Sequence, residues 1–445
     1  MLNRKVSAIA AGTALIALLS SCGGSSGGNA GDANPKEAGP APSKIDTDKP
    51  LEIVFHTNSG DSEEAFNDLY GNALRKKFPN WTIRYVQSKA GQTLPELLAQ
   101  GQQIDVLYAS APYFFQLVTN VNMQYDMTEL AKTRQVDLTK FEPTLIDGIR
   151  SSGDGKLYGL PITNMNQVLF YNKGIFNQFG VPYPKDGMTW DDALELAKKV
   201  TRREGDRQYI GLAASPAHIL GSNQLSKPYT DPVTDKPTFQ DDAWKQLIRT
   251  LFLAPAEDEG YKARATELKR IPYRLELTNS QELAMFVFNS QFPFIVPKDM
   301  EKIEWDLVSL PTFKEKPKVG SQAAPVVMGV TSSAKNKEAA MEAIAYLTGA
   351  DIQMSYSKKG IMPVIDEAAV KKAYGSESAF KDKNWQAVFY NEFAPMAKKS
   401  KYQLLVEGKL TPNIVDVVTG KTDLNTALRK SAEEAEKAIA EEKQK

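Results

Sequence analysis

Two short segments of the sequence carry side chains that could bind a polar molecule. Each segment directly follows a predicted β-strand, and ligands of open α/β sheets bind beyond the carboxyl ends of the strands. Amides, carboxylates and hydroxyls exchange hydrogen bonds with such a ligand, and aromatic rings pack on its apolar faces. The candidate ligand-binding residues in the two segments are His56, Asn58, Asp61, Tyr108, Ser110 and Tyr113.

A structural role competes with the binding role at several of these positions. His56 stands at a strand end, where a hydrogen bond that holds the fold is an equal alternative. Asp61 could cap the helix that follows it, since carboxylates are preferred at helix N-caps. Tyr108 and Tyr113 could belong to a core, although their place in a loop favours a pocket.

Patterns typical of enzymes and metal sites are missing. One Cys and two His exclude a CxxC redox pair and disfavour a thiolate or multi-histidine metal site. G-x-S-x-G, H-E-x-x-H, Walker and strand-linked G-x-G-x-x-G motifs are absent. Paired carboxylates decide nothing, because 54 acidic residues always supply a pair. We therefore expect no catalysis, no cofactor and no metal.

The charge balance and the length limit the function further. Lys and Arg number 54 and Asp and Glu number 54, so the chain has no basic field to hold nucleic acid. With 445 residues and 42% hydrophobic content, the chain is long enough for two or three folded domains. We expect a monomer that binds a small molecule.

The elements that position the candidates alternate between strands and helices. Strands are predicted at 51–55, 81–86 and 104–108, with helices at 66–78 and 94–99 between them. This order is typical of a parallel sheet covered by helices on both faces. Later segments continue the α/β pattern, with strands predicted at 157–161, 168–173 and 325–330 and helices at 184–200, 244–253, 337–347 and 424–445.

The first residues read as an export signal. Arg4 and Lys5 precede an apolar run from Val6 to Leu19, which is shorter than the roughly 20 residues that span a bilayer. The run ends in Leu19-Ser20-Ser21-Cys22, which resembles the bacterial lipobox. That resemblance implies a signal peptide over residues 1–21 and a lipid anchor on Cys22. The alternatives are an ordinary secretory signal with a chance Cys, or a buried core thiol. Residues 22–49, rich in Gly, Ser and Pro at their start, are predicted to be a flexible tether.

Six motifs, in order, resemble the family-1 extracellular solute-binding proteins of ABC importers, the group that includes maltose-binding protein. Each motif is loose by itself, and the order behind a lipobox makes the combination specific. They are Lys156–Pro161 with Val168–Lys173, Met188–Ala193, Glu282–Val287, Trp305–Pro311, Lys335–Ala340 with Ile344–Leu347, and Gly360–Val364.

The resemblance implies an α/β fold of two lobes, each a mainly parallel sheet flanked by helices, with a ligand cleft that closes by hinge bending. Lobe one would comprise residues 50–162 and 318–350, and lobe two residues 163–317 and 351–445. Crossings between the lobes would fall near 161–166, 311–318 and 349–354. Pro161 and Pro311 favour the extended chain that a crossing needs.

The resemblance adds further candidate ligand-binding residues. Many sugar-binding relatives carry Gly-Pro-Trp where this chain has the Gln291-Phe292 region, a departure that weakens the sugar assignment. The four other Trp residues, at 81, 190, 244 and 305, are read as packing, and His218 is read as a surface residue without a partner. The additional candidates are Asn164, Asn166, Asn289, Gln291, Phe292, Met328, Trp385 and Tyr390.

Two functional hypotheses follow. The first is a lipid-anchored binding protein that takes a solute, expected to be a sugar or oligosaccharide, and delivers it to the permease subunits of an ABC importer in the cell membrane. The second is a cell-surface lipoprotein that degrades or adheres to polysaccharide. Ligand-induced stabilisation favours the first, and product release from glycans favours the second.

Overall fold

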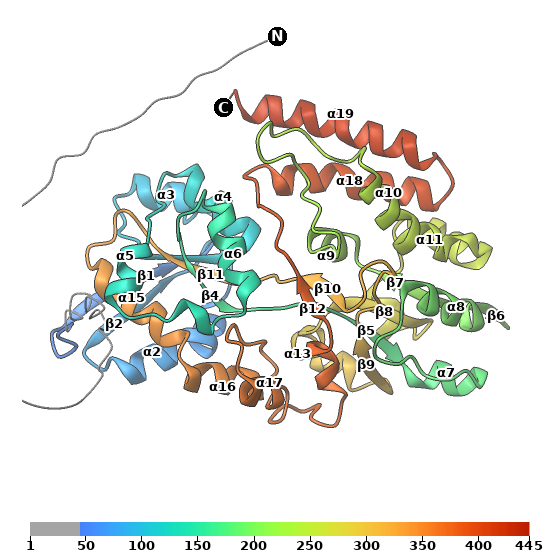
Figure 1. Cartoon of the computed structure of the whole chain (residues 1–445), viewed down its shortest axis with the longest axis horizontal. Coiled ribbons are helices and arrows are strands. Elements are labelled where there is room, and N and C mark those ends of the chain that lie inside the picture. Colours follow the sequence, from blue (N-terminus) through green and yellow to red (C-terminus); the bar gives the residue numbers. More distant parts are fainter. Residues whose placement is uncertain (1–44, 445) are drawn as a thin grey trace, which may run out of the picture. The chain divides into compact units, whose positions relative to one another are not determined.

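The structure is a computed structural model that describes residues 45–444, which lie within one compact unit. Within these residues the strands form two five-stranded sheets and one two-stranded sheet (Figure 1). The predicted signal peptide, Cys22 and most of the predicted tether lie outside the described residues.

The first sheet has the strand order β2-β1-β3-β11-β4. β1 pairs in parallel with β2 and β3, while β11 lies antiparallel between β3 and β4. Its buried strands are rich in Val, Ile, Leu and aromatic residues, as expected for a sheet covered on both faces. The strands are β1 (Leu51–His56), β2 (Trp81–Val86), β3 (Val106–Ser110), β4 (Leu160–Thr163) and β11 (Val326–Val330).

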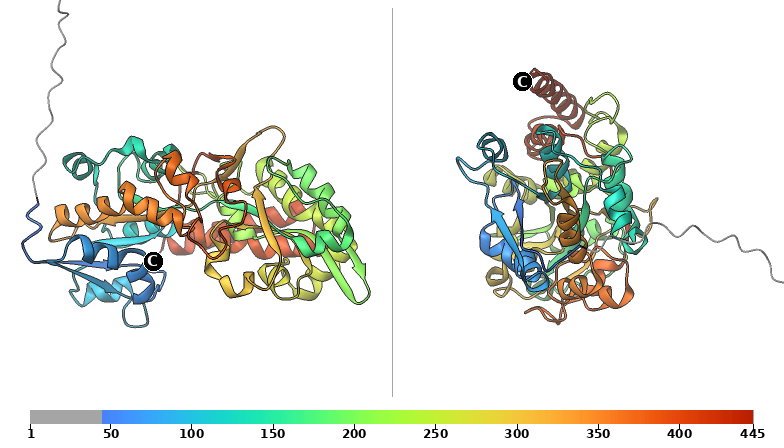
Figure 2. Two further views of the ribbon diagram at one scale, coloured as in Figure 1. Left: turned by 90° about the horizontal axis from the view of Figure 1, so that it is seen from below. Right: turned by 90° about the vertical axis from the view of Figure 1, so that its left-hand side faces the viewer.

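Helices around this sheet bury an apolar stripe against it. In α15, Ala340, Ile344 and Leu347 follow the helical period and are fully buried, and the helix packs along the strands (Figure 2). The helical segments of this part are α1 (Glu63–Phe66), η1 (Asn67–Gly71), α2 (Asn72–Lys77), α3 (Leu94–Ala99), α4 (Ala111–Asn120), α5 (Thr128–Thr133), η2 (Leu138–Lys140), α6 (Pro143–Ser152), α15 (Lys337–Leu347), α16 (Ala350–Lys358) and α17 (Ala368–Lys372).

The second sheet has the order β6-β7-β8-β5-β9. β7 and β8 are parallel, and the other neighbours are antiparallel. The strands are β5 (Gln167–Asn172), β6 (Arg202–Glu204), β7 (Arg207–Ala214), β8 (Leu283–Asn289) and β9 (Trp305–Ser309).

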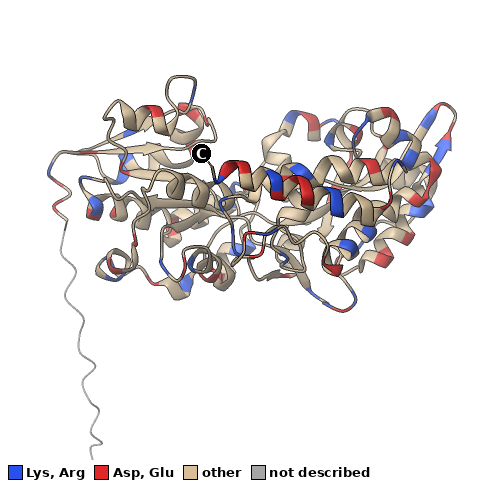
Figure 3. Ribbon diagram, turned by 90° about the horizontal axis from the view of Figure 1, so that it is seen from above, with Lys and Arg blue, Asp and Glu red and all other residues tan. Residues whose placement is uncertain are grey.

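The helices of the second part include the long C-terminal pair α18 and α19, which lie side by side (Figure 1). Acidic and basic residues alternate along α19 (Figure 3), with Arg429 and Glu433 paired at 2.8 Å. The helical segments are α7 (Lys173–Phe179), α8 (Trp190–Val200), α9 (Pro216–Gly221), α10 (Asp242–Ile248), η3 (Arg249–Leu253), η4 (Pro255–Glu257), α11 (Glu259–Leu268), α12 (Arg274–Thr278), α13 (Phe292–Ile295), α14 (Pro297–Met300), η5 (Trp385–Phe389), α18 (Gln403–Val418) and α19 (Leu424–Glu442).

The chain passes from one sheet to the other between β4 and β5, at residues 164–166, and between β9 and β11. The second passage contains β10 (Val319–Gln322), which pairs in parallel with β12 (Glu392–Ala394) to form the two-stranded sheet. Buried amides fix these passages. Gln322 donates to the Asn223 carbonyl at 2.8 Å and accepts from the Ala397 N–H at 2.7 Å.

The predicted α/β fold with two helix-flanked sheets is confirmed. In the first sheet only β11 runs against the other four strands, and in the second sheet β5 and β6 run against β7, β8 and β9. β5 and β11 each enter their sheet from a passage between the sheets, without the helical crossover that a parallel neighbour needs.

The chain also differs from expectation near residue 350. Tyr356 and Val370, from α16 and α17, join the core around the first sheet, so the chain does not leave that core at residues 349–354. The lobe boundaries as a whole stay predictions. The four Trp residues expected to pack, Trp81, Trp190, Trp244 and Trp305, are all buried in the cores.

Replacing Gln353 should destabilise the fold strongly. Its buried amide donates to the carbonyls of Ile162 and Leu347 at 2.9 and 2.8 Å and accepts from the Val364 N–H at 2.8 Å. Gln353→Leu leaves three buried backbone groups without that partner, so the free energy of unfolding should fall by about 3 kcal/mol. Denaturant unfolding measures the change, with the exposed Gln240→Leu as control. A loss no larger than the control's would contradict this role.

Candidate functional site

A cavity of about 580 Å³ brings together residues of the first sheet and its loops, Met165 of the passage at 164–166, and Gln291, which follows β8 of the second sheet. Six predicted ligand-binding residues line it: Asn58, Asp61, Tyr108, Ser110, Tyr113 and Gln291. Eight further lining residues were not predicted: Ser59, Leu69, Tyr70, Ala109, Thr163, Met165, Val326 and Ile361. The two strand-end loops therefore do face a common space, as their position after β1 and β3 predicts.

Asp61 is held firmly at the edge of this cavity. The Ser59 hydroxyl donates to one carboxylate oxygen at 2.7 Å, and the Tyr108 hydroxyl donates to the other at 3.1 Å. The Tyr85 hydroxyl donates to the Asp61 backbone carbonyl at 2.7 Å. Ser62, not Asp61, caps helix α1, since its side chain accepts from the Ala65 N–H. The carboxylate keeps acceptor capacity for a ligand.

Tyrosine rings form one wall of the cavity. Tyr70 lies edge-on to Tyr108 with ring centroids 5.5 Å apart, and Phe66 stacks on Tyr85 behind them at 4.6 Å. Burial and then the Asp61 charge raise the pKa of Tyr70 and Tyr108 well above 10, and the pKa of Tyr85 to about 12. All three hydroxyls therefore remain protonated donors at neutral pH.

From the part of the chain around the second sheet, the cavity lining has one amide, that of Gln291. Gln291 lines the cavity and, with Asn289, directs its side-chain N–H toward the Met165 sulfur, at 3.6 and 3.4 Å respectively. A thioether is a weak acceptor, so these donors are only weakly satisfied. The Gln167 side-chain amide donates to the side-chain oxygen Oδ1 of Asn289 and so fixes the Asn289 amide. A ligand oxygen would be a stronger partner for the Gln291 donor than the sulfur.

Four other predicted residues lie around the passages and the strands rather than in the cavity lining. The Asn164 side-chain oxygen Oδ1 accepts from the Ala324 N–H at 3.0 Å, and the Asn166 side-chain amide donates to the Val388 carbonyl at 2.7 Å. Met328 is fully buried in β11. His56 is also fully buried, with Nδ1 2.9 Å from the Val86 carbonyl, which favours the structural alternative.

The remaining predicted aromatic residues also lie outside the cavity lining. Phe292 is buried in the second core against Phe288, with centroids 5.2 Å apart. Trp385 is buried, stacks on Phe294 at 5.0 Å and donates from Nε1 to the Phe380 carbonyl. Tyr390 is exposed, with Lys318 over its ring. Asn289 donates to the Met165 sulfur and does not line the cavity. A ligand role for these residues stays a prediction.

Most of the unpredicted lining residues carry no sequence signal for binding. Tyr70 follows Phe66 by four residues, which reads as the buried face of a helix. In the structure both Leu69 and Tyr70 lie in the π-helical segment η1, and π-turns often occur at functional sites. Met165 has an apolar side chain, so its residue type also indicates a core position. Ser59 could have been predicted from the sequence, because it stands in a turn between the predicted ligand-binding residues Asn58 and Asp61.

His218 differs from its expected surface position. It lies in α9 with its ring 4.5 Å from the centroid of Phe288, and its Nδ1 is 2.7 Å from the Ser215 hydroxyl. Burial lowers its pKa. In the described chain no group of three or more His, Cys, Asp or Glu is arranged to hold a metal ion. None of the helices over residues 45–444 has the length and apolarity to cross a membrane.

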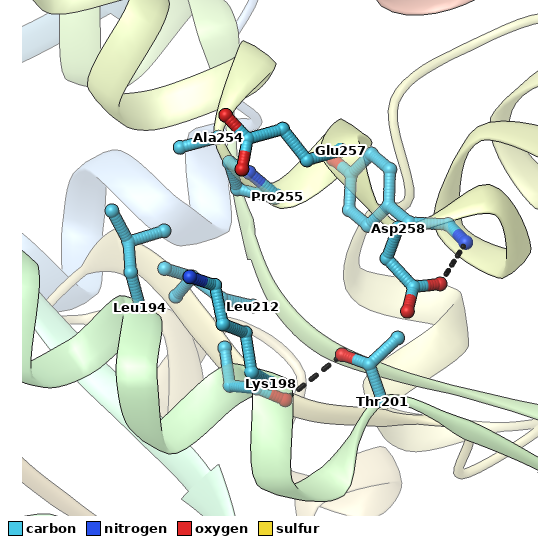
Figure 4. Close-up of a pocket in the computed structure, with 10 residues that line it drawn as sticks. Leu194, Lys198, Thr201, Leu212, Ala254, Pro255, Glu257 and Asp258 are labelled. Atoms are coloured by element: carbon cyan, nitrogen blue, oxygen red, sulfur yellow. Dashed lines mark hydrogen bonds between the residues drawn. The ribbon is translucent and has the colours of Figure 1, made fainter.

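A second, smaller cavity of about 240 Å³ lies between α8, β7 and α11 (Figure 4). Leu194, Leu212 and Pro255 give it an apolar floor, and Lys198 and Glu257 stand at its side. Its Thr201 hydroxyl already donates to the Ala197 carbonyl at 2.9 Å. Its lining comes from the second part of the chain alone, so it lacks the two-sided construction of the larger cavity.

Comparison with known proteins gives a consistent result. The family described as bacterial extracellular solute-binding protein matches residues 58–354. A binding protein of Brucella abortus is 22% identical over 238 residues, which are 50% of this chain and 54% of the relative, so the match spans about half the length of that curated relative.

Solved structures share the fold at low sequence identity. A sugar transporter of Rhizobium etli in an open conformation has a TM-score of 0.70 at 18% identity, covering 86% of this chain and 99% of that one. An ABC substrate-binding protein of Listeria monocytogenes in complex with cycloalternan has a TM-score of 0.66 at 17% identity, with 88% and 100% covered. A solute-binding protein of Agrobacterium vitis with bound D-mannitol has a TM-score of 0.58 at 16% identity, with 88% and 99% covered.

His56→Gln should weaken the acid sensitivity of the fold. Burial lowers the pKa of His56 below its ordinary 6.5, against the opposing effect of the Val86 hydrogen bond. The stability gained by keeping this ring neutral is present above pH 6.5 and is lost as pH falls through the lowered pKa. The free energy of unfolding, measured from pH 8 to pH 5, should therefore fall less steeply in the variant.

His218→Gln provides the internal comparison, because burial also lowers the pKa of His218 and its share of the slope is separable. A His56→Gln profile parallel to that of the wild type would contradict the assignment.

Proposed function

Because this chain belongs to the bacterial extracellular solute-binding proteins, we propose that it is the binding component of an ABC importer and captures a sugar or oligosaccharide in the cavity lined by Asp61, Tyr113 and Gln291. The observation that carries the proposal is that one cavity collects rings, hydroxyls, a carboxylate and two amides from both sides of the passages. Sugars present C–H faces for the rings and hydroxyls for the polar groups.

The ligands named for the solved relatives support this class of solute. The Listeria protein holds cycloalternan and the Agrobacterium protein holds D-mannitol, both of which are polyhydroxylated and uncharged. No catalytic step is part of the proposal, since binding alone accounts for the arrangement of the cavity.

Capture would follow hinge closure over the passages between the sheets. The ligand would first rest on the side of Asp61 and the tyrosines. Closure would then bring the Gln291 amide onto its hydroxyls, in exchange for the weak contact with the Met165 sulfur. Affinity then comes from contacts that only the closed form completes.

We further propose that the protein is anchored to the outer face of the cell membrane through Cys22 and delivers its solute to the permease subunits. The lipobox-like sequence before Cys22 supports the anchor, and the family supports the permease partner. Two acyl chains of a diacylglyceryl group hold a protein stably where a single chain does not. A Gly- and Ser-rich tether would let the folded part reach the permease.

A saccharide panel tests the binding function. A ligand present at 100 times its dissociation constant stabilises the folded form by about 2.7 kcal/mol, which raises the melting temperature measurably. A panel of mono-, di- and trisaccharides that produces no shift would contradict the proposal. Release of shortened glycans on incubation would instead support the polysaccharide-degrading alternative.

Tyr113→Ala should weaken saccharide binding. The Tyr113 side chain lines the cavity and is 45% exposed, so its ring is available to pack on a sugar face. Loss of this ring should reduce the affinity by about tenfold or more, measured by titration calorimetry. Tyr125→Ala, which removes a partly exposed ring outside the cavity, should change the affinity less than about twofold.

Cys22→Ala should release the protein from the membrane. The wild-type protein, expressed in a bacterial host that processes lipoproteins, should sediment with membranes and incorporate labelled palmitate. The variant should lose the label. A wild-type protein that is secreted without label would contradict the anchor and leave the binding proposal intact.

A further inference from the structure

The charged side chain that lines the candidate cavity is negative. Asp61 contributes a carboxylate, and no Lys, Arg or His is among the described residues that line the cavity. The partners of the carboxylate are the neutral hydroxyls of Ser59 and Tyr108. Among the ion pairs of residues 45–444, none involves Asp61, so its charge stands without a cation at the place where a ligand would bind.

Buried tyrosine rings lie on one side of this carboxylate. Tyr70 and Tyr108 are buried, and their rings close one side of the cavity. The Tyr108 hydroxyl lies 3.1 Å from the carboxylate, and the Asp61 charge adds to the effect of burial in raising the pKa of Tyr70, Tyr85 and Tyr108. Interactions between charges are stronger in such partly dry surroundings than in water.

We infer that Asp61 acts as a charge filter, so that the cavity accepts uncharged and amine-bearing saccharides and rejects saccharides that carry carboxylates. The inference rests on the proposed saccharide-binding function and deepens it. A uronate entering the cavity would lose water from its own carboxylate and meet a second carboxylate, with no cation to offset either effect. An ammonium group would meet its natural partner.

The hydrogen bonds of Asp61 also explain how it can bind a sugar hydroxyl and repel a ligand carboxylate. Ser59 and Tyr108 each occupy one of its oxygens, and every carboxylate oxygen has a second lone pair. A sugar hydroxyl can therefore still donate to Asp61. A ligand carboxylate has no hydrogen to donate and can only repel it.

The experiment compares matched disaccharides by titration calorimetry at pH 7. Three pairs differ in charge and share their linkage: α-1,4-galactobiose with α-1,4-digalacturonate, β-1,4-mannobiose with β-1,4-dimannuronate, and cellobiose with the β-1,4-linked glucosamine disaccharide. The wild type should bind each uronate at least about tenfold more weakly than its neutral partner, and the amine at least as tightly as cellobiose.

Asp61→Asn removes the charge and keeps the size of the side chain. The preference for neutral over acidic disaccharides should shrink by about tenfold in this variant. Asp206→Asn makes the same charge change at an exposed turn away from the cavity and should leave the preference unchanged. If none of the six disaccharides binds the wild type, new binding of an acidic one to Asp61→Asn supports the filter, and its absence contradicts it.

The outcomes separate the two proposals. A wild-type protein that binds a uronate as tightly as its neutral partner overturns the charge filter and leaves the saccharide-binding function standing. If neither the wild type nor Asp61→Asn binds any member of the pairs or of the wider saccharide panel, the proposed function is overturned, and the filter falls with it.

Discussion

A chain that leaves one sheet and enters another loses the ladder partners of its backbone, and buried amide side chains replace them here. Gln353 holds the end of β4, Gln322 joins β10 to the segment after β12, and Gln224 donates to the carbonyls of Pro311 and Val319 at 2.9 and 2.8 Å. Each of these glutamines is buried, so water cannot replace it as the hydrogen-bond partner of the backbone groups. The position of Gln291, the cavity residue that follows β8 of the second sheet, depends on these passages.

The elements of the first sheet could be predicted because their signals are local. The alternation of residues 81–86 and the apolar run of 51–55 place β2 and β1 to within a residue. The partner of β11 could not be predicted in this way, because pairing with β3 depends on a contact across more than 200 residues of sequence. The same limit applies to the antiparallel pairing of β5 with β8.

For the candidate site, the sequence predicts the cavity residues that lie on loops after strands, and it does not predict Tyr70 or Met165. Asn58, Asp61 and Tyr113 lie on loops that follow strands, so their position can be argued from topology alone. Tyr70 and Met165 have the residue types of a core, and only the π-helical turn and the passage at 164–166 turn them toward the cavity. Trp385, which the sequence analysis placed near the ligand, lies in the second core outside the cavity lining, and its ligand role stays a prediction.

The core around the first sheet has a consequence for how the chain folds. It contains Ile53 near the start of the described chain and Met396 near its end. Neither half of the sequence can therefore complete a core by itself, and a chain emerging from the ribosome has to wait for its last quarter. Contacts at such separation close slowly, because the entropy of the long loop is lost before they form. The order in which the sequence visits its two sheets thus keeps the unfinished chain open for longer than a lobe built from one continuous segment would be.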